Sequence, residues 1–242
     1  MSGKTTRKRK PIVTAAVLVC ALVVVALVVV AVLSFRSADS GDSTAASHDS
    51  PVPIAERYLA AIAAGDADAA HLLDGAAFET APHSRVGVDL LSDDVMAVAQ
   101  ERIADVSVSL ISATESKASV QTQFSLAGET YTPRVFFEWD EARDDWIITS
   151  SLSNILDVYS FTTETDRERL PFTVEGLDAT LQQSADAGSL LGYAMYPGVY
   201  LVTPTIEAGT LADPGAAFRE VTVFPYDQEG VLPAADFELK SD

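Results

Sequence analysis

The chain has 242 residues and a formal net charge of −19, from 16 basic and 35 acidic residues. Nucleic-acid affinity comes mainly from Lys and Arg that neutralise phosphates, so this charge excludes DNA and RNA as partners. Cys20 is the only cysteine, which excludes disulfides within the chain and a cysteine-rich zinc site.

The N-terminal segment is first basic and then apolar. Five of the first ten residues are Lys or Arg, and Ile12 to Leu33 follow without a charge. As a helix these 22 residues would span about 33 Å, enough to cross a bilayer core of roughly 30 Å. We predict a cytoplasmic basic tail at 1–11 and a transmembrane helix at 12–35, with everything that follows outside the cell because of the positive-inside bias. Cleavage after Ser34 is the alternative.

The segment 36–52 is rich in Ser, Asp and Ala and almost free of large apolar residues. Such a composition cannot bury enough surface to fold, so we predict a flexible stalk in which His48 is solvated.

Helical periodicity follows the stalk. Ile54, Tyr58, Leu59 and Ile62 share one helical face, and the pattern stops at Gly65. Two further short helices are predicted, with Asp66 and Ser92 as their N-caps.

The period then changes to two. Four strands are predicted around Val106–Leu110, Val120–Leu126, Tyr131–Trp139 and Trp146–Leu152, with a tight acidic turn from Asp140 to Asp145 before the last. Helices followed by an antiparallel meander predict an α+β domain at 53–152.

The segments AERYLAAIAAGDADAAHLL, SDDVMAVAQERIADVSVSL and DDWIITSSL carry a family resemblance. They resemble the nuclear-transport-factor-two-like (cystatin-like cone) superfamily. More narrowly, they resemble extracytoplasmic domains of single-pass Gram-positive membrane proteins, such as that in teicoplanin-resistance-associated membrane proteins. The resemblance implies helices on a curved antiparallel sheet and a role in the cell envelope.

Beyond residue 153 short apolar runs alternate with turn signals, among them Pro197-Gly198 between two apolar runs. This pattern predicts a small all-β domain at 153–242, with a single intertwined unit as the alternative. The expected fold class is therefore α+β: an N-terminal transmembrane helix, helices on a cone-like curved sheet, and a small all-β domain.

Candidate chemistry is sparse. Enzymes of the cone superfamily place an acid–base pair in their cavity, and the histidines outside the stalk are His71 and His83. Either would need Asp74, Asp89 or Asp93 as its partner, and no spacing enforces a pair. His71, His83 and Asp74 also lack a recognised zinc-ligand spacing, and the chain has no nucleophile-elbow sequence.

Two other clusters have simple structural explanations. The turn Asp140–Asp145 offers carboxylates to a hard cation but lacks the order of a calcium loop, and a charged hairpin tip explains it as well. On strand alternation, Phe137 and Trp139 share one face and Phe136 lies on the other. Core packing is the first explanation, and an apolar pocket in the cone is the alternative.

We therefore assign no catalytic, cofactor-binding or metal-ligating residue and expect no cofactor. The predicted function is a non-enzymatic, membrane-anchored extracytoplasmic binding or interaction module of the bacterial cell envelope. Its expected partners are the membrane and an envelope protein or cell-wall component. The alternative is a small-molecule site or an isomerase- or hydrolase-like enzyme in the cone, with Asp93 or His71 as the base.

Overall fold

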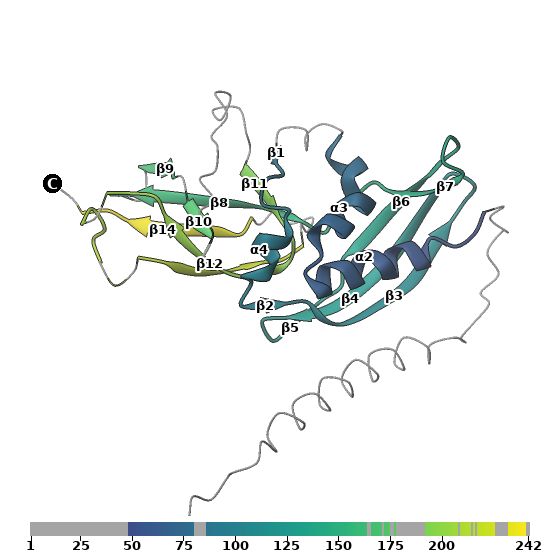
Figure 1. Ribbon diagram of the computed structural model, residues 1–242, viewed down its shortest axis with the longest axis horizontal. Helices are drawn as coiled ribbons and strands as arrows, with labels where there is room; N and C mark the ends of the chain where they lie inside the picture. The colour runs from purple at the N-terminus through teal and green to yellow at the C-terminus, as the bar shows by residue number, and fades with distance from the viewer. Residues whose placement is uncertain are drawn as a thin grey trace, which may run out of the picture. The chain divides into compact units, whose positions relative to one another are not determined.

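The computed structural model describes residues 48–79, 86–163, 166–170, 172–174, 177, 192–207, 209–213, 215, 217–225 and 232–240. Contacts group Ser43–Asp242 into one compact unit, to which all of these residues belong (Figure 1). The predicted anchor at 12–35 and most of the predicted stalk lie outside the described residues.

The predicted helices near the start of the unit are confirmed. Helix α2 (Val52–Ala64) ends at Gly65, whose φ of 81° is a left-handed conformation that glycine adopts without strain. The Asp66 side chain caps α3 (Ala67–Asp74) by accepting from the Ala69 N–H at 2.9 Å. Ser92 caps α4 (Asp93–Ala97) through a longer bond of 3.4 Å to the Val95 N–H.

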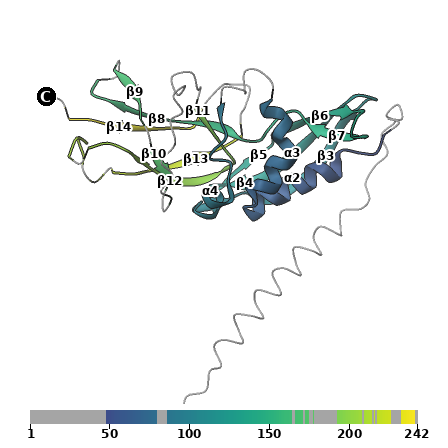
Figure 2. The same cartoon turned by 45° about the horizontal axis from the view of Figure 1, so that its top comes forward.

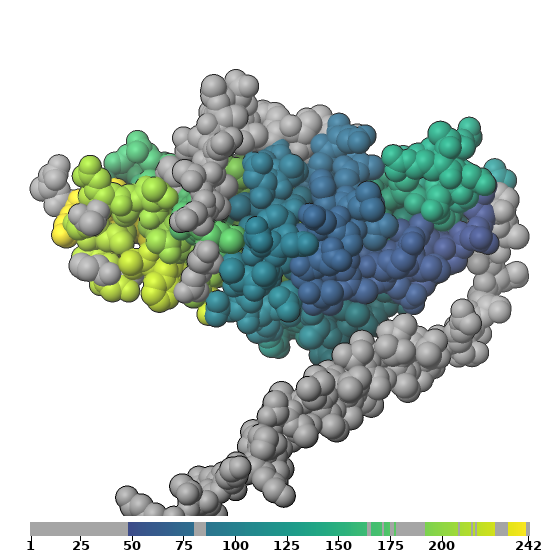
Figure 3. All heavy atoms as spheres, in the orientation of Figure 1, coloured from purple at the N-terminus to yellow at the C-terminus, as the bar shows by residue number. Residues whose placement is uncertain are grey.

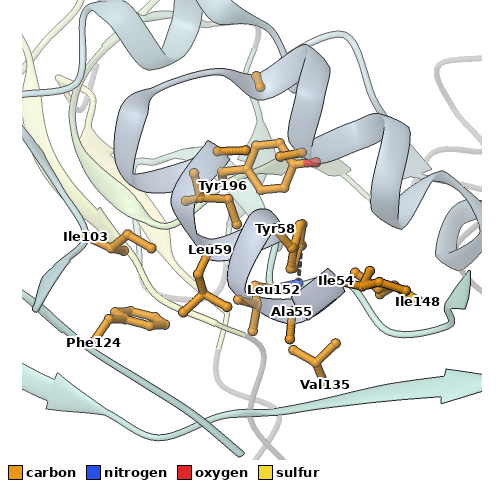
Figure 4. Packing of buried hydrophobic residues seen from close by; sticks show 14 of the residues in the cluster. Ile54, Ala55, Tyr58, Leu59, Ile103, Phe124, Val135, Ile148, Leu152 and Tyr196 are labelled. Carbon is orange, nitrogen blue, oxygen red and sulfur yellow. Dashed lines mark hydrogen bonds between the residues drawn. The ribbon is translucent and has the colours of Figure 1, made fainter. Parts of the chain in front are cut away.

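An antiparallel sheet follows in the order β3-β4-β6-β7, with β5 also paired to β4. Its strands are β3 (Ala104–Ala113), β4 (Lys117–Leu126), β5 (Glu129–Tyr131), β6 (Arg134–Asp140) and β7 (Asp145–Ile148). Alternate residues of β4, from Ala118 to Leu126, are buried, because this face of the sheet packs against α2. Figure 4 shows the contact, with Leu59 and Tyr58 of α2 close to Phe124, Val135 and Leu152.

The rest of the chain forms two more sheets. One has the order β1-β11-β8-β14 with β9 beside β8, and the other has the order β10-β12-β13 with β2 beside β12. Their strands are β1 (Val86–Gly87), β2 (Glu101–Arg102), β8 (Asn154–Phe161), β9 (Arg167–Arg169), β10 (Phe172–Val174), β11 (Gly192–Met195), β12 (Gly198–Pro204), β13 (Arg219–Val223) and β14 (Ala234–Glu238). The two sheets lie face to face (Figure 2). They enclose a second apolar cluster, which includes Leu156 and Phe237 from one and Val202 and Val221 from the other.

Strand pairing crosses the predicted boundary between residues 152 and 153. Val86 of β1 pairs in parallel with Gly192, and Arg102 of β2 pairs with Gly198. Leu90 and Val95 belong to the second apolar cluster, whereas Tyr196 and Val199 belong to the first. Residues 86–102 therefore connect the two predicted domains through both backbone pairing and packing.

The predicted α+β fold class is wrong. The described residues are 47% strand and 19% helix, with three α-helices and three sheets in place of one helix-covered cone. The periodicity of α2 correctly predicted a helix. The many short strands beyond residue 153 form two further sheets, however, so strand residues outnumber helical residues. Among the described residues no helix has the length and apolar character needed to cross a membrane.

Candidate functional site

Asp74 is the centre of a buried polar cluster. Its carboxylate is fully buried and accepts hydrogen bonds from three hydroxyl groups: Tyr58 at 2.7 Å, Ser151 at 2.6 Å and Tyr196 at 3.0 Å. The Tyr58 hydroxyl in turn accepts from the Leu152 N–H at 2.9 Å, the dashed bond in Figure 4. One buried charge thus joins α2, the end of α3, the β7–β8 connection and the β11–β12 turn.

Burial dominates the electrostatics of this cluster. Desolvation raises the pKa of Asp74, although the three hydroxyl donors and His71 act in the opposite direction. Desolvation and the nearby Asp74 charge raise the pKa of both Tyr58 and Tyr196, so both phenols stay protonated and act as donors. The three groups that donate hydrogen bonds to the Asp74 carboxyl group are therefore neutral hydroxyls.

His71 is the predicted candidate that the fold brings to Asp74. Its Nδ1 lies 3.4 Å from Asp74 Oδ1, which is longer than a good N–H···O hydrogen bond. The His71 side chain is about one-third exposed, at 36%, and its ring lies 5.5 Å from that of Phe78. The contact is an ion pair only when His71 is protonated.

The other predicted partners lie elsewhere or outside the described residues. Asp93 accepts from the Asp68 N–H at 3.1 Å and is exposed, so it joins α4 to α3. Burial raises the pKa of Tyr193, and the charge of nearby Asp89 raises it further. His83 is not among the described residues.

The hydrogen bonds of the Asp74 cluster hold distant segments of the chain together. Two hydroxyl donors approach Oδ2 and one approaches Oδ1, so the chain supplies three hydrogen bonds to the Asp74 carboxyl group. These three hydrogen bonds link the Asp74 carboxyl group to distant parts of the chain. Within the part of the chain that the structure describes, no group of three His, Cys, Asp or Glu side chains is placed to hold a metal ion.

The acidic turn between β6 and β7 is organised by its own donors. Asp140 accepts from the Ala142 N–H at 2.9 Å, and its other oxygen lies 3.2 Å from Arg143 Nε. Asp144 has a φ of 53°, a left-handed conformation that Asp tolerates in tight turns. These contacts are those of a charged hairpin tip.

The aromatic residues of β6 divide as the alternation predicts. Phe137 is 1% exposed and packs in the first apolar cluster, whereas Phe136 on the opposite face is 47% exposed. Trp139 and Trp146 form an edge-to-face pair beside the charged turn.

The predicted solvated position of His48 is wrong. Its imidazole stacks on Trp139, and the Trp146 indole N–H donates to the Asp49 carbonyl at 2.6 Å. Two tryptophans therefore hold the residues just before α2, which the polar composition of the stalk did not indicate.

Strand β3 is the feature that the sequence interpretation did not single out. It ends the order β3-β4-β6-β7, and among the described residues no strand pairs with its outer edge. Eight of its ten residues are exposed and the other two are half-buried. Three large apolar side chains on it are 40–44% exposed: Val106, Leu110 and Ile111.

The register of β3 assigns its side chains to two faces. Val108 pairs with Thr122 and Leu110 with Val120, both buried on the helix side of the sheet. Ser107 and Ser109 pair with Gln123 and Gln121 on the opposite face. Register shifts between Ala104 and Ser107, and again between Leu110 and Ser112, bound a regular stretch between them.

Edge strands are usually protected by charges, proline, short length or a covering element. At the other end of the same sheet, β7 has four residues and lies against the 3₁₀ helix η1 (Gly75–Phe78). From Val106 to Thr114, β3 and its turn carry no charge and no proline. The alternation of apolar residues with serine predicts a strand, but only the sheet order reveals that it lies at an edge. In the space-filling view α2 and α3 cover much of the visible face of this sheet (Figure 3).

Comparisons with protein-family models, with curated proteins and with solved structures found no match.

Proposed function

We propose that this chain is a non-enzymatic, membrane-anchored extracytoplasmic interaction module of the bacterial cell envelope, and that the free edge of β3 is its partner-binding site. The observation that carries the proposal is a ten-residue edge strand that has no charge from Val106 onward and exposes apolar side chains. An extended segment can add to such an edge through backbone hydrogen bonds, while its alternate side chains meet those of β3.

Two further observations support a binding role over chemistry. The best-formed group of titratable residues lies around Asp74, which is buried and hydrogen-bonded to Tyr58, Tyr196 and Ser151. The localisation rests on the basic tail and the uncharged run from Ile12 to Leu33. A tethered domain with such an edge strand suits capture of a neighbouring protein at the membrane surface.

The test places a photo-crosslinking amino acid at position 109 in the full-length chain in its native membrane. Ser109 is exposed near the middle of β3, and its side chain makes no contact that the structure describes. Ala142, exposed at the tip of the charged turn, provides the control position. We expect a protein adduct, whether with another protein or with a second copy of this chain, from position 109 and none from position 142. Equal labelling from both positions, or no adduct from position 109, would overturn the proposal.

A further inference from the structure

We propose that the occupant of the β3 edge is the β3 edge of a second copy of this chain, paired antiparallel about a two-fold axis at Val108. This inference rests on the proposed function, since it names the partner of the same edge. The result would be one continuous sheet shared by two copies, with the same surface used on both sides of the interface.

The sequence of β3 is self-complementary about Val108. In that register Val106 of one copy faces Leu110 of the other, Ser107 faces Ser109, and Val108 faces Val108. Every pair joins residues of like kind, apolar with apolar or serine with serine. The register with β4 places Val108 and Leu110 on the helix side. Cross-strand pairs of like character are the contacts that stabilise an antiparallel sheet.

Charge favours this surface for contact between two copies. The chain carries a formal net charge of −19, so most approaches of one copy to another bring like charges together. The stretch from Val106 to Thr114 carries no charge. The nearest acid before it, Asp105, accepts from the Ser125 hydroxyl at 2.8 Å within its own sheet.

The chain's own N-terminal linker is a poorer occupant of this edge. Residues 36–47 include Asp39 and Asp42 and offer no large apolar side chain after Phe35 to set against Val106, Val108 and Leu110. A strand added there would place small polar groups against the three exposed or half-buried apolar residues. The second copy supplies matching apolar groups at all three positions.

The size of the contact sets its strength. The register shifts before Ser107 and after Leu110 limit regular pairing with β4 to about four residues, which is a strand length of about 13 Å. Such a contact is smaller than a standard protein interface, so a dimer of this kind is weak in dilute solution. Confinement of both copies to one membrane raises their effective concentration and with it the dimer fraction.

The first experiment uses disulfide cross-linking of the full-length chain in membranes, with Cys20→Ser to remove the native thiol. Antiparallel partners directly opposite lie about 4.5–5.5 Å apart at Cα, within the range of a disulfide. We expect Val108→Cys to give a cross-linked dimer. Ser109→Cys should cross-link far less, because diagonal neighbours are about 7–8 Å apart, and Ala142→Cys should not cross-link.

A second pair of variants tests the register through charge, with Val108→Cys cross-linking as the readout. The S107K/S109K chain places Lys opposite Lys twice in the dimer, and we expect Val108→Cys cross-linking to fall about tenfold on that background. The S107E/S109E chain by itself should lose Val108→Cys cross-linking to a similar extent, because Glu then lies opposite Glu. Mixing the two chains should restore the cross-link, because each Lys then faces a Glu. Ser107 and Ser109 are both exposed, so both variants keep the fold of the sheet.

The outcomes separate this inference from the proposed function. Cross-linking from Val108→Cys no stronger than from Ala142→Cys, or no rescue on mixing, overturns the two-copy interface. If the photo-crosslinker at position 109 then captures a different protein, the edge is still a binding site and only the second copy is rejected. If it captures nothing, both the interface and the proposed function are rejected.

Discussion

The imidazole of His48 lies flat against the indole of Trp139, with ring centroids 3.6 Å apart and an angle of 13° between the planes. Trp146 stands edge-on to the same imidazole and donates its indole N–H to the carbonyl of Asp49. The residues that lead into α2 are therefore held by a pair of tryptophans from the β6–β7 hairpin.

Replacing His48 should weaken this attachment. We expect His48→Ala to lower the free energy of unfolding by about 0.5–1.5 kcal/mol, the value of a stacked aromatic pair beyond simple burial. Urea unfolding followed by tryptophan fluorescence measures the change. Asp49→Ala is the matched control, because Asp49 contributes its backbone carbonyl and the bond from Trp146 should survive. Equal losses in both variants would mean that the stack contributes little.

The Asp74 cluster should be among the most sensitive sites to substitution. Asp74→Ala leaves the hydroxyls of Tyr58, Tyr196 and Ser151 without their shared acceptor in a buried place. Each unsatisfied buried polar group costs about 1–3 kcal/mol, so we expect a loss of about 3 kcal/mol or more. Glu56→Ala, at an exposed position of α2, should change stability by less than about 0.5 kcal/mol. A loss below about 1 kcal/mol for Asp74→Ala in chemical denaturation would contradict the assigned role.

The pH dependence of stability should carry the signature of the same residue. Because burial raises the pKa of Asp74 above its ordinary value of 3.8, the folded state binds this proton more tightly than the unfolded state. Its contribution to stability is therefore fully present below pH 3.8 and is lost as the pH rises through the folded-state pKa.

The chain has 35 Asp and Glu residues, so the contribution of Asp74 is measured as the difference in stability between the native chain and a variant at this position. We expect the stability of the native chain minus that of Asp74→Asn to fall as the pH is raised above 3.8. Thermal or urea unfolding of both proteins over the same pH series tests this. A difference that increases with pH would show that the hydroxyl donors, and not burial, dominate the pKa of Asp74.

Gly192 occupies a position where the backbone and the packing both require glycine. Its φ is 147°, and a Cβ built there would lie 2.2 Å from Ile155 Cγ2 and 3.1 Å from Asp157 Oδ1. Gly192→Ala should therefore cost about 2–4 kcal/mol, from strain and from displacement of Ile155. Gly75 has a φ of −53° and no atom within 4 Å of such a Cβ, so Gly75→Ala should be neutral or stabilise by about 0.5 kcal/mol. Similar melting temperatures for the two variants would contradict this difference.

Local chemistry in the sequence determined most of the elements. The helix cap at Asp66, the left-handed stop at Gly65 and the alternation along β4 depend on neighbours within a few residues, and each agrees with the structure. The opposite faces of Phe136 and Phe137 follow from the same alternation. The fold class did not follow, because helical periodicity near α2 does not reveal how many sheets the later strands form.

The contacts between distant residues were decided only by the tertiary structure. Asp74 meets Tyr196, 122 residues later, because the β11–β12 turn packs beside α3, and no spacing in the sequence encodes that meeting. Likewise, the serine–apolar alternation of β3 predicts a strand but not its place at the end of a sheet. Periodicity reports which side of an element is buried, whereas partners, edges and the order of strands depend on long-range packing that only the folded chain specifies.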